Sequence, residues 1–492
     1  MAGTEHGSVC SGSSMRVVSR RLVKASDTTT TTISPRVVAF TNLDLLNDMQ
    51  LYVACLYRMP ATSTYSAVAA TFEAHMPSFL NHMFPMAGRI VRDPVSGLPE
   101  ELRCGNQGAE LVLADAGVAL RALDWSLANE SVRKILVPFP DEVPLSLQLV
   151  SFTCGLGFAV VWGFHHLLGD GSFGGMLMKT WCELVMTGSI SGGGPSHDRA
   201  VFFRPRDPPS YSASFAATFT PWDHEHQVNG LTAEASFVQR HYYVEGRDVA
   251  RLRDTASTTE PGGRRRRATR AEAVSAYLWK VLAGVVASLT RLADDEKRCR
   301  MAWLVDGRRR LTLTSSTPEL RRALRSYAGN VTTHAVGDAA VAAVLSRPLA
   351  EVAAMVRDAI TAPDYDALCQ ETVDWVEAHK RTGLSYAHTV ALGLGSPTLA
   401  MTVVSSEHNS ETDFGFGPAV LGMPVDARDG RLCTAHMYVT TRPADGSWIV
   451  NAYVWPRLAA ALEADEGRVF RPITAEYLGL GECLPPEARP RL

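Results

Sequence analysis

Residues 163–171, with the sequence GFHHLLGDG, constrain the fold more than any other stretch of this 492-residue chain. Two apolar runs precede it, at 145–153 and 158–164, and predict a pair of strands joined by a turn. Apolar residues then recur at helical spacing up to Gly188, namely Phe173, Leu177, Trp181 and Leu184. The stretch therefore predicts a strand that turns sharply into a helix.

A histidine and a carboxylate stand at this turn, and Gly169 and Gly171 give its backbone the freedom to bend. Asp170 can set the tautomer and the direction of His166, so that the other ring nitrogen faces a substrate as a general base. A buried structural histidine is the alternative. As metal ligands the pair would need a further ligand, and because no spaced His/Cys/Asp/Glu cluster supplies one, we expect no metal. His165 points elsewhere in an extended segment and is expected to be structural.

Five separated motifs together resemble the plant acyl-CoA-dependent acyltransferases known as the BAHD family. The two principal signatures are His166-x-x-x-Asp170-Gly171 and, much later, Asp413-Phe414-Gly415-Phe416-Gly417. Three secondary landmarks also occur in the order that the family has: Phe84-Pro85-Met86-Ala87-Gly88-Arg89, Val305-Asp306-Gly307-Arg308 and Tyr327-Ala328-Gly329-Asn330. The resemblance spans nearly the whole chain, from about Val37 to Asp465.

The resemblance implies an α/β protein of the chloramphenicol-acetyltransferase-like fold, with two similar-sized domains and a channel between them. It places the catalytic histidine midway along that channel. His166 matches this general base, which takes the acceptor's proton as the acceptor attacks an acyl-CoA thioester. Asp170 matches an aspartate that holds the loop through a salt bridge to an arginine, for which Arg308 is a candidate.

The second signature is expected to be a loop, because it has two glycines and no periodicity. The resemblance groups Asp413 with the catalytic machinery, although the motif acts at a distance by shaping the domain contact and the CoA path. Phe414, Gly415, Phe416 and Gly417 are its structural residues, and Phe416 stands where the family usually has Trp. Family members often carry a Trp oxyanion donor just before this loop, where this chain has Ser405-Ser406-Glu407. We expect Ser405, Ser406, a backbone N–H or a water molecule to donate the oxyanion hydrogen bond instead, and the sequence leaves open which of them does so.

A basic run at 264–267 precedes Thr269-Arg270-Ala271-Glu272, a capping-box pattern that opens an apolar helix. A helix N-terminus beside cations favours phosphate, and CoA carries phosphates that family members contact near the corresponding helix start. We therefore expect Thr269 and Arg270 to contact CoA, more than the arginine run does. A solvated loop is the alternative.

The chain is longer than one hydrophobic core usually allows, so we expect two domains. The predicted division is a flexible segment at 1–34, an N-terminal acyltransferase domain at 35–190, a breaker-rich crossover linker at 191–225 and a C-terminal acyltransferase domain at 226–492. Further expectations are a hairpin within 102–113, a buried strand at 399–405 and a hairpin of 436–441 with 448–454.

Charge and cysteine content indicate which classes of partner and which cellular compartment to expect. The net charge of −3 gives no reason to expect nucleic acid or an anionic membrane as a partner. Nine scattered cysteines indicate reduced thiols in an intracellular setting. No apolar run is long enough to span a bilayer, and we expect a cytoplasmic monomer. The ending Pro490-Arg491-Leu492 leaves peroxisomal import as the alternative.

The predicted function is transfer of an acyl group from acyl-CoA, a co-substrate and not a bound cofactor, to an alcohol or phenol of plant specialised metabolism, with release of free CoA. Three alternatives stay open. The acceptor can be an amine. The donor can be a carrier protein, because the histidine motif is also similar to that of peptide-synthetase condensation domains. The chain can also be a non-catalytic homologue that acts as a partner of another enzyme.

Overall fold

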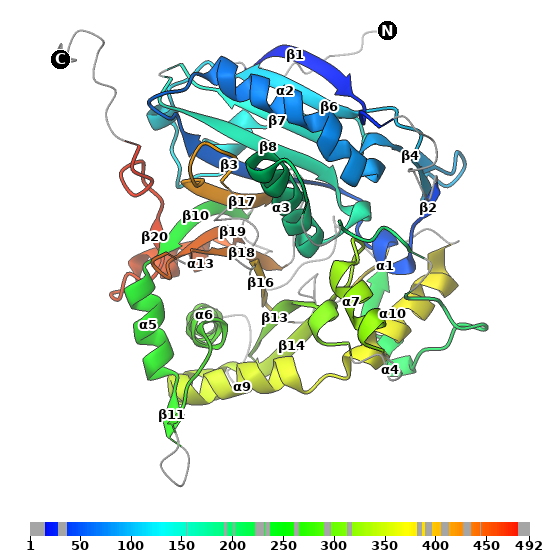
Figure 1. Cartoon of the computed structure of the whole chain (residues 1–492). Helices are drawn as coiled ribbons and strands as arrows, with labels where there is room; N and C mark the ends of the chain where they lie inside the picture. The colour runs from blue at the N-terminus through cyan, green and yellow to red at the C-terminus, as the bar shows by residue number, and fades with distance from the viewer. Residues whose placement is uncertain are drawn as a thin grey trace, which may run out of the picture.

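The computed structural model describes residues 15–27, 37–153, 155–190, 194–199, 202–221, 231, 237–259, 265–289, 297–311, 317–380, 386–388, 396–404, 413–426, 434–442 and 444–480. Two large sheets, each covered by helices, form the two halves seen one above the other in Figure 1. This mixed α/β architecture confirms the predicted fold class.

The first sheet carries the strand that leads into the histidine turn. Its order is β1 (Arg16–Val23), β6 (Ala109–Asp115), β7 (Leu145–Ser151), β8 (Gly157–His165), β3 (Gln50–Arg58) and β17 (Leu421–Asp426). β8 is central and all nine of its residues are buried, which is why its sequence is one apolar run. Two helices, α2 (Tyr65–His82) and α3 (Gly171–Thr187), pack on one face around Phe72, Phe79 and Trp181.

The second sheet forms the other half and packs against its own helices. Its order is β14 (Thr332–Ala340), β13 (Arg298–Asp306), β16 (Thr398–Val404), β18 (Ala435–Thr441), β19 (Trp448–Val454), β10 (Val238–Val244) and β20 (Arg471–Pro472). The helices are α5 (Gly246–Thr255), α6 (Arg270–Ala287), α8 (Val341–Ser346), α9 (Leu349–Thr361) and α13 (Pro456–Ala464). α6 buries Leu278, Trp279 and Leu282 in this core, beside α9 (Figure 1).

Smaller elements lie at the junction and edges of the halves. A three-stranded sheet joins β2 (Val37–Ala39), β5 (Pro99–Arg103) and β4 (Arg89–Arg92). The short pairs are β9 (Phe219–Pro221) with β15 (Tyr386–His388), and β11 (Thr258–Thr259) with β12 (Arg265–Arg266). The other α-helices among the described residues are α1 (Asn42–Leu45), α4 (Ala213–Ala216), α7 (Pro318–Ser326) and α10 (Tyr365–His379).

One strand from the C-terminal part of the sequence lies in the first sheet. β17 belongs to the C-terminal part of the sequence, yet it pairs antiparallel with β3 and completes the first sheet. From there it also reaches the second half, because Asn451 Nδ2 on β19 donates a hydrogen bond to the Pro424 carbonyl at 2.9 Å. The N- and C-terminal segments therefore do not form two sheets that are each continuous in sequence.

Two expectations are wrong. Residues 16–23 of the segment predicted to be flexible form β1, which pairs with β6. The predicted hairpin at 102–113 does not form, because β5 pairs with β2 and β4 while β6 pairs with β1 and β7. The rest of the segment predicted to be flexible, 1–14 and 28–34, lies outside the described residues, as do 191–193, 200–201 and 222–225 of the predicted linker.

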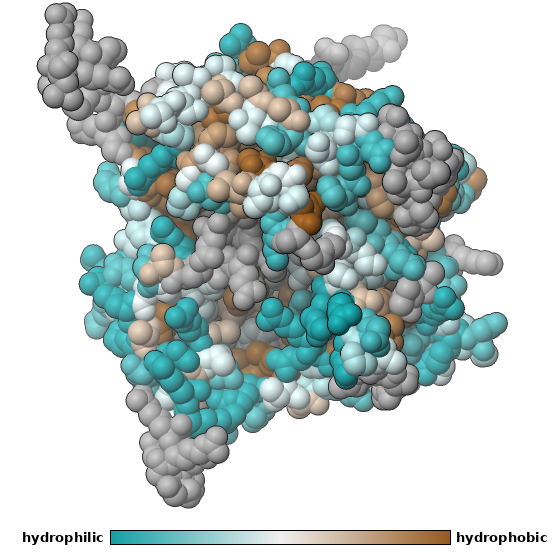
Figure 2. Space-filling view, viewed as in Figure 1, coloured by the Kyte–Doolittle hydropathy of each residue, from teal (hydrophilic) through white to brown (hydrophobic). Residues whose placement is uncertain are grey.

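The hairpin and the strand predicted in the C-terminal part of the chain are confirmed. β18 and β19 form the expected antiparallel hairpin, and β16 covers 398–404. In the part of the chain that the structure describes, no helix is both long and apolar enough to cross a membrane. Figure 2 shows hydrophilic side chains spread over much of the described surface of this face, with smaller apolar areas between them.

Candidate active site

The predicted strand-to-helix crossing is present and places the histidine at its bend. β8 ends at His165, a 3₁₀ turn covers His166–Leu168, and α3 begins at Gly171. His166 is half-buried, whereas its neighbours His165 and Leu167 are buried. Gly169 is required by close packing rather than by an unusual φ, because a side chain there would collide with the carbonyl oxygen of Ala328.

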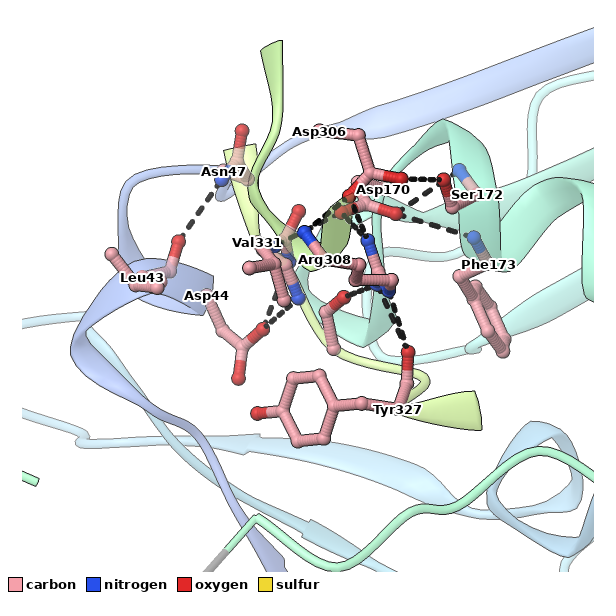
Figure 3. Close-up of polar contacts among 12 residues, drawn as sticks. Leu43, Asp44, Asn47, Asp170, Ser172, Phe173, Asp306, Arg308, Tyr327 and Val331 are labelled. Carbon is pink, nitrogen blue, oxygen red and sulfur yellow. Dashed lines mark hydrogen bonds and ion pairs between the residues drawn. The ribbon is translucent and has the colours of Figure 1, made fainter. Parts of the chain in front are cut away.

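Asp170 is the N-cap of α3 and does not face a substrate as a base. One carboxylate oxygen, Oδ1, accepts the backbone N–H groups of Ser172 at 3.0 Å and Phe173 at 3.2 Å. The other, Oδ2, accepts from Arg308 Nη1 at 2.8 Å and from the Val331 N–H at 2.9 Å. Figure 3 shows the carboxylate enclosed by these groups. The structure thus confirms Arg308 as the expected ion-pair partner.

Opposing effects determine the charge of Asp170. Burial alone raises the pKa of this carboxyl, but the Arg308 guanidinium and the backbone N–H groups of Val331 and Phe173 outweigh burial and hold the pKa below its ordinary value. Asp170 is therefore ionised at neutral pH. Both of its oxygens are occupied, which suits the orienting role predicted for Asp170.

Arg308 also makes hydrogen bonds to other residues of the second half of the molecule. Its guanidinium donates to the Tyr327 carbonyl at 2.9 Å and the Gly329 carbonyl at 2.5 Å, and to Asp306 Oδ1 at 3.1 Å. Asp306 Oδ2 in turn accepts from the Ser172 hydroxyl at 2.9 Å, as Figure 3 shows. The end of β13 is thus fastened to the start of α3, which lies next to the histidine turn.

His165 is structural, as predicted. Its ring is fully buried, with Nε2 3.2 Å from Asp141 Oδ1 and 3.6 Å from Asp48 Oδ1. Its Nδ1 accepts the Leu167 N–H at 3.4 Å, which leaves Nε2 to carry the proton toward the carboxylates. Burial lowers the pKa of His165 below its ordinary value. His165 therefore stabilises the turn that carries His166.

The second signature forms a loop at the other end of α3. Asp413 Oδ1 accepts the N–H groups of Gly415 and Gly417, both at 2.8 Å. These two glycines have φ of +87° and +88°, which a residue with a side chain rarely adopts. The Asp413 carbonyl accepts from Cys182 Sγ on α3 at 2.9 Å. Cys182 follows Asp170 by twelve residues, about 18 Å along the helix, so Asp413 organises its loop far from the histidine turn.

The aromatic residues of this signature anchor the loop in the first core. Phe414 is fully buried, with ring centroids 5.5 Å from Tyr57 and 6.0 Å from Trp162. Phe416 is half-buried and lies 5.7 Å from the ring of Phe158. The expected oxyanion candidates, Ser405 and Ser406, lie outside the described residues.

The predicted CoA-contacting residues cap α6. The Thr269 hydroxyl accepts the Glu272 N–H at 3.1 Å, while the Glu272 carboxylate accepts the Thr269 N–H at 2.9 Å. Arg357 pairs with Glu272 at 3.1 Å, and the Arg270 side chain is exposed. The structure confirms the capping box and leaves the phosphate contact a prediction. Across the described ranges, no group of three or more His, Cys, Asp or Glu side chains could hold a metal.

Two buried residues near the histidine turn were missed as functional candidates. Asp44 follows Thr41 by three residues, a capping-box spacing that signals the start of α1. Asn330 ends the Tyr-Ala-Gly-Asn landmark, but the motif alone assigns it no contact. The structure brings Asp44, Asn330 and the backbone of His166 together.

Comparisons with known proteins identify the family. Residues 14–456 match the model described as Transferase family. The chain is 27% identical over 407 residues to anthranilate N-benzoyltransferase protein 1 of Dianthus caryophyllus, covering 79% of this chain and 83% of that protein. It is 25% identical over 356 residues to omega-hydroxypalmitate O-feruloyl transferase of Arabidopsis thaliana, covering 70% and 71%.

The solved structures share the fold. F. graminearum TRI101 complexed with coenzyme A and T-2 mycotoxin superposes with a TM-score of 0.67 at 14% identity, covering 88% of this chain and 99% of that one. The family model covers most of the sequence and includes the histidine turn, the first sheet and all of the second sheet except β20. The chain therefore belongs to the Transferase family, and it is an acyl-CoA-dependent acyltransferase of the BAHD type.

Proposed function

We propose that this protein transfers an acyl group from an acyl-CoA to the hydroxyl group of a small metabolite, with His166 as the general base. The observation that carries the proposal is the turn between β8 and α3. It presents a half-buried His166 while the adjacent carboxylate, Asp170, is fully engaged by Arg308 and backbone N–H groups. Because Asp170 is held in this structural role, His166 is the residue of the signature that we assign to proton transfer with the substrate.

The proposed reaction needs no reactant other than the acyl-CoA and the acceptor. His166 removes the hydroxyl proton as the oxygen attacks the thioester carbonyl, and a C–O bond forms. The tetrahedral intermediate then collapses, the C–S bond breaks, and the CoA thiolate takes the proton back from the imidazolium. A histidine suits both steps because its ordinary pKa, about 6.5, leaves much of it neutral at physiological pH.

An aromatic acyl group is the proposed donor class, because both relatives described above carry one in their names, benzoyl and feruloyl. An amine is the second candidate acceptor, and the anthranilate N-benzoyltransferase favours it. For an amine His166 has the same task, since the nitrogen must lose a proton after it attacks. Asp170, the carboxylate of the motif, takes no proton in either proposed reaction.

A matrix of two donors and two acceptors tests the proposal. Benzoyl-CoA and feruloyl-CoA are each incubated with anthranilate and with omega-hydroxypalmitate, while CoA thiol release and product mass are followed. We expect thiol release that depends on an acceptor, and an acylated product. Mild alkali cleaves an ester and spares an amide, which separates the two acceptor classes. Lack of any acceptor-dependent thiol release, with a broader acceptor panel included, would favour the non-catalytic alternative.

A further inference from the structure

The backbone of His166 is held from both halves of the molecule. Its N–H donates to the Met49 carbonyl at 2.8 Å, just before β3. Its carbonyl accepts the Gly169 N–H at 3.1 Å, within the turn, and the side-chain amide of Asn330 at 2.9 Å. Asn330 lies between α7 and β14, so the second half reaches across to the residue that carries the base.

The orientation of the Asn330 amide is set by its neighbours. Nδ2 donates to the His166 carbonyl and to Asp44 Oδ1, both at 2.9 Å, and the Asn330 backbone N–H donates to the same Oδ1 at 3.0 Å. A carbonyl and an ionised carboxylate accept hydrogen bonds and donate none. If the amide were flipped, its oxygen would face two acceptors. Asn330 is therefore held with its NH₂ group toward the histidine turn.

Asp44 is itself firmly placed. Its other oxygen, Oδ2, accepts the backbone N–H and the hydroxyl of Thr41 at 2.9 Å and 2.8 Å, and lies 3.7 Å from Arg199 Nε. Asp44 and Asn330 are 0% and 1% exposed. Figure 3 shows the two hydrogen bonds to Oδ1 meeting at one oxygen of the Asp44 carboxylate.

The next residue extends the same contact, because the Val331 N–H donates to Asp170 Oδ2 at 2.9 Å. Consecutive residues of the second half thus hold both ends of the His166–Asp170 segment. A shift of about 1 Å in a catalytic group can cost about 10²-fold in rate, so an anchor on the His166 carbonyl bears directly on where the imidazole points.

We propose that Asn330 is a positioning residue. Its side-chain amide bridges the His166 carbonyl and the Asp44 carboxylate, and this bridge sets the direction of the His166 imidazole. The inference rests on the proposed function for its effect on turnover, but not for its effect on the imidazole. Asn330 acts through the backbone of His166, and its amide is already committed to two protein acceptors.

Asn330→Ala tests the proposal against a matched control, Asn42→Ala. Asn42 is also buried, and its Nδ2 also links α1 to the second half, donating to the Val373 carbonyl at 2.8 Å and Glu377 Oε2 at 2.9 Å. These bonds do not involve the histidine turn. We expect both variants to lose similar thermal stability. Asn330→Ala should also lose about 30- to 100-fold in kcat with an acyl-CoA KM changed less than about threefold, while Asn42→Ala keeps kcat within about threefold.

A second readout does not need turnover. Diethyl pyrocarbonate acylates imidazoles, and peptide mass spectrometry gives its rate at the 165–166 peptide. That rate should change more than about threefold in Asn330→Ala and stay unchanged in Asn42→Ala. If the wild-type protein shows no turnover but the modification rate still changes in Asn330→Ala, the proposed function is overturned and the positioning role stands. Equal behaviour of the two variants in both assays would overturn the positioning role.

Asn330→Asp provides the second variant in case the alanine variant does not fold. It keeps the side-chain volume but turns an oxygen toward two acceptors, and burial beside Asp44 raises the pKa of the new carboxyl. Below that pKa the carboxyl can donate one hydrogen bond again, so the kcat ratio of variant to wild type should rise as pH falls from 8 to 6. A flat ratio contradicts the proposal. So does failure of both variants to fold while Asn42→Ala folds, because Asn330 would then be needed for folding itself.

Discussion

Oδ2 of Asp170 lies 2.8 Å from Nη1 of Arg308, and both side chains are almost completely buried. The pair joins the start of α3 to the end of β13, so it connects the two halves next to the proposed base. A buried ion pair adds little net stability when it replaces apolar packing, but removing one partner leaves an uncompensated charge. Its value here is geometric, because it fixes the segment that follows His166.

Asp170→Asn should therefore lower both stability and activity. The neutral amide leaves Arg308 without its main counter-charge, at a cost of about 3–5 kcal/mol in the free energy of unfolding. Urea unfolding measures the loss, and kcat should fall with it. The exposed pair of Lys134 and Glu130 is the control, since Glu130→Gln should cost less than about 1 kcal/mol. A large fall in rate with unchanged stability would argue that Asp170 acts on the substrate instead.

His166→Ala should remove turnover without unfolding the protein. Loss of a general base typically costs about 10² to 10⁴ in rate, while the backbone bonds of residue 166 to Met49 and Asn330 remain available. Thiol release measures the rate, and calorimetry should show a melting temperature and CoA binding close to wild type. A variant that keeps more than a tenth of the turnover would mean that another group takes the proton.

Phe414→Ala should destabilise the first half more than Phe416→Ala does. Phe414 is fully buried among Tyr57, Phe72 and Trp162, so its loss leaves a cavity that costs about 3–5 kcal/mol. Phe416 is half-buried and its loss should cost less than half as much. Denaturant unfolding of the two variants gives the comparison, and equal losses would show that the loop is not anchored through Phe414.

Arg270→Ala tests the predicted phosphate contact at the start of α6. The KM for acyl-CoA should rise about threefold to fivefold with kcat nearly unchanged, because a remote phosphate binds equally in the ground and transition states. Arg266→Ala, at an exposed position on β12, is the control and should change KM less. An acyl-pantetheine thioester lacks the nucleotide phosphates. If Arg270→Ala weakens this donor to the same extent as acyl-CoA, phosphate is not its partner.

Stability should fall in mild acid, partly through His241 on β10. Its buried Nδ1 donates to the Trp125 carbonyl at 2.9 Å, and burial lowers the pKa of His241 to about 4. The unfolded chain takes up this proton near pH 6.5. The contribution is therefore complete above pH 6.5 and is lost as pH falls toward 4, up to about 3 kcal/mol.

Urea unfolding at pH 7, 6 and 5 checks this dependence with two variants. His241→Asn keeps a donor for the Trp125 carbonyl and cannot titrate. Between pH 6 and 5 the variant should therefore lose about 1.2 kcal/mol less of its free energy of unfolding than the wild type loses. The exposed His82→Asn should keep the wild-type slope. An unchanged slope for His241→Asn would show that other groups control the acid response.

Local structure around the site was predictable because each part depends on neighbouring residues. The apolar run of β8 and the helical spacing of α3 lie within about thirty residues. The capping box of α6 and the hairpin of β18 and β19 are of the same kind. The resemblance to a family supplied the roles of His166 and Asp170, which spacing alone leaves open.

The sequence by itself determined the local elements: where the strand before the histidine ends, that a helix follows it, and that 413–417 must be a loop. Only the tertiary structure decided that β17 completes the first sheet, that β5 and β6 lie in different sheets, and that Asp44 and Asn330, 286 residues apart, meet at His166. Periodicity, caps and turns report the conformation of a short segment. Pairing between distant segments depends on which buried donors and apolar faces remain unmatched after the whole chain has packed, and no short segment contains that information.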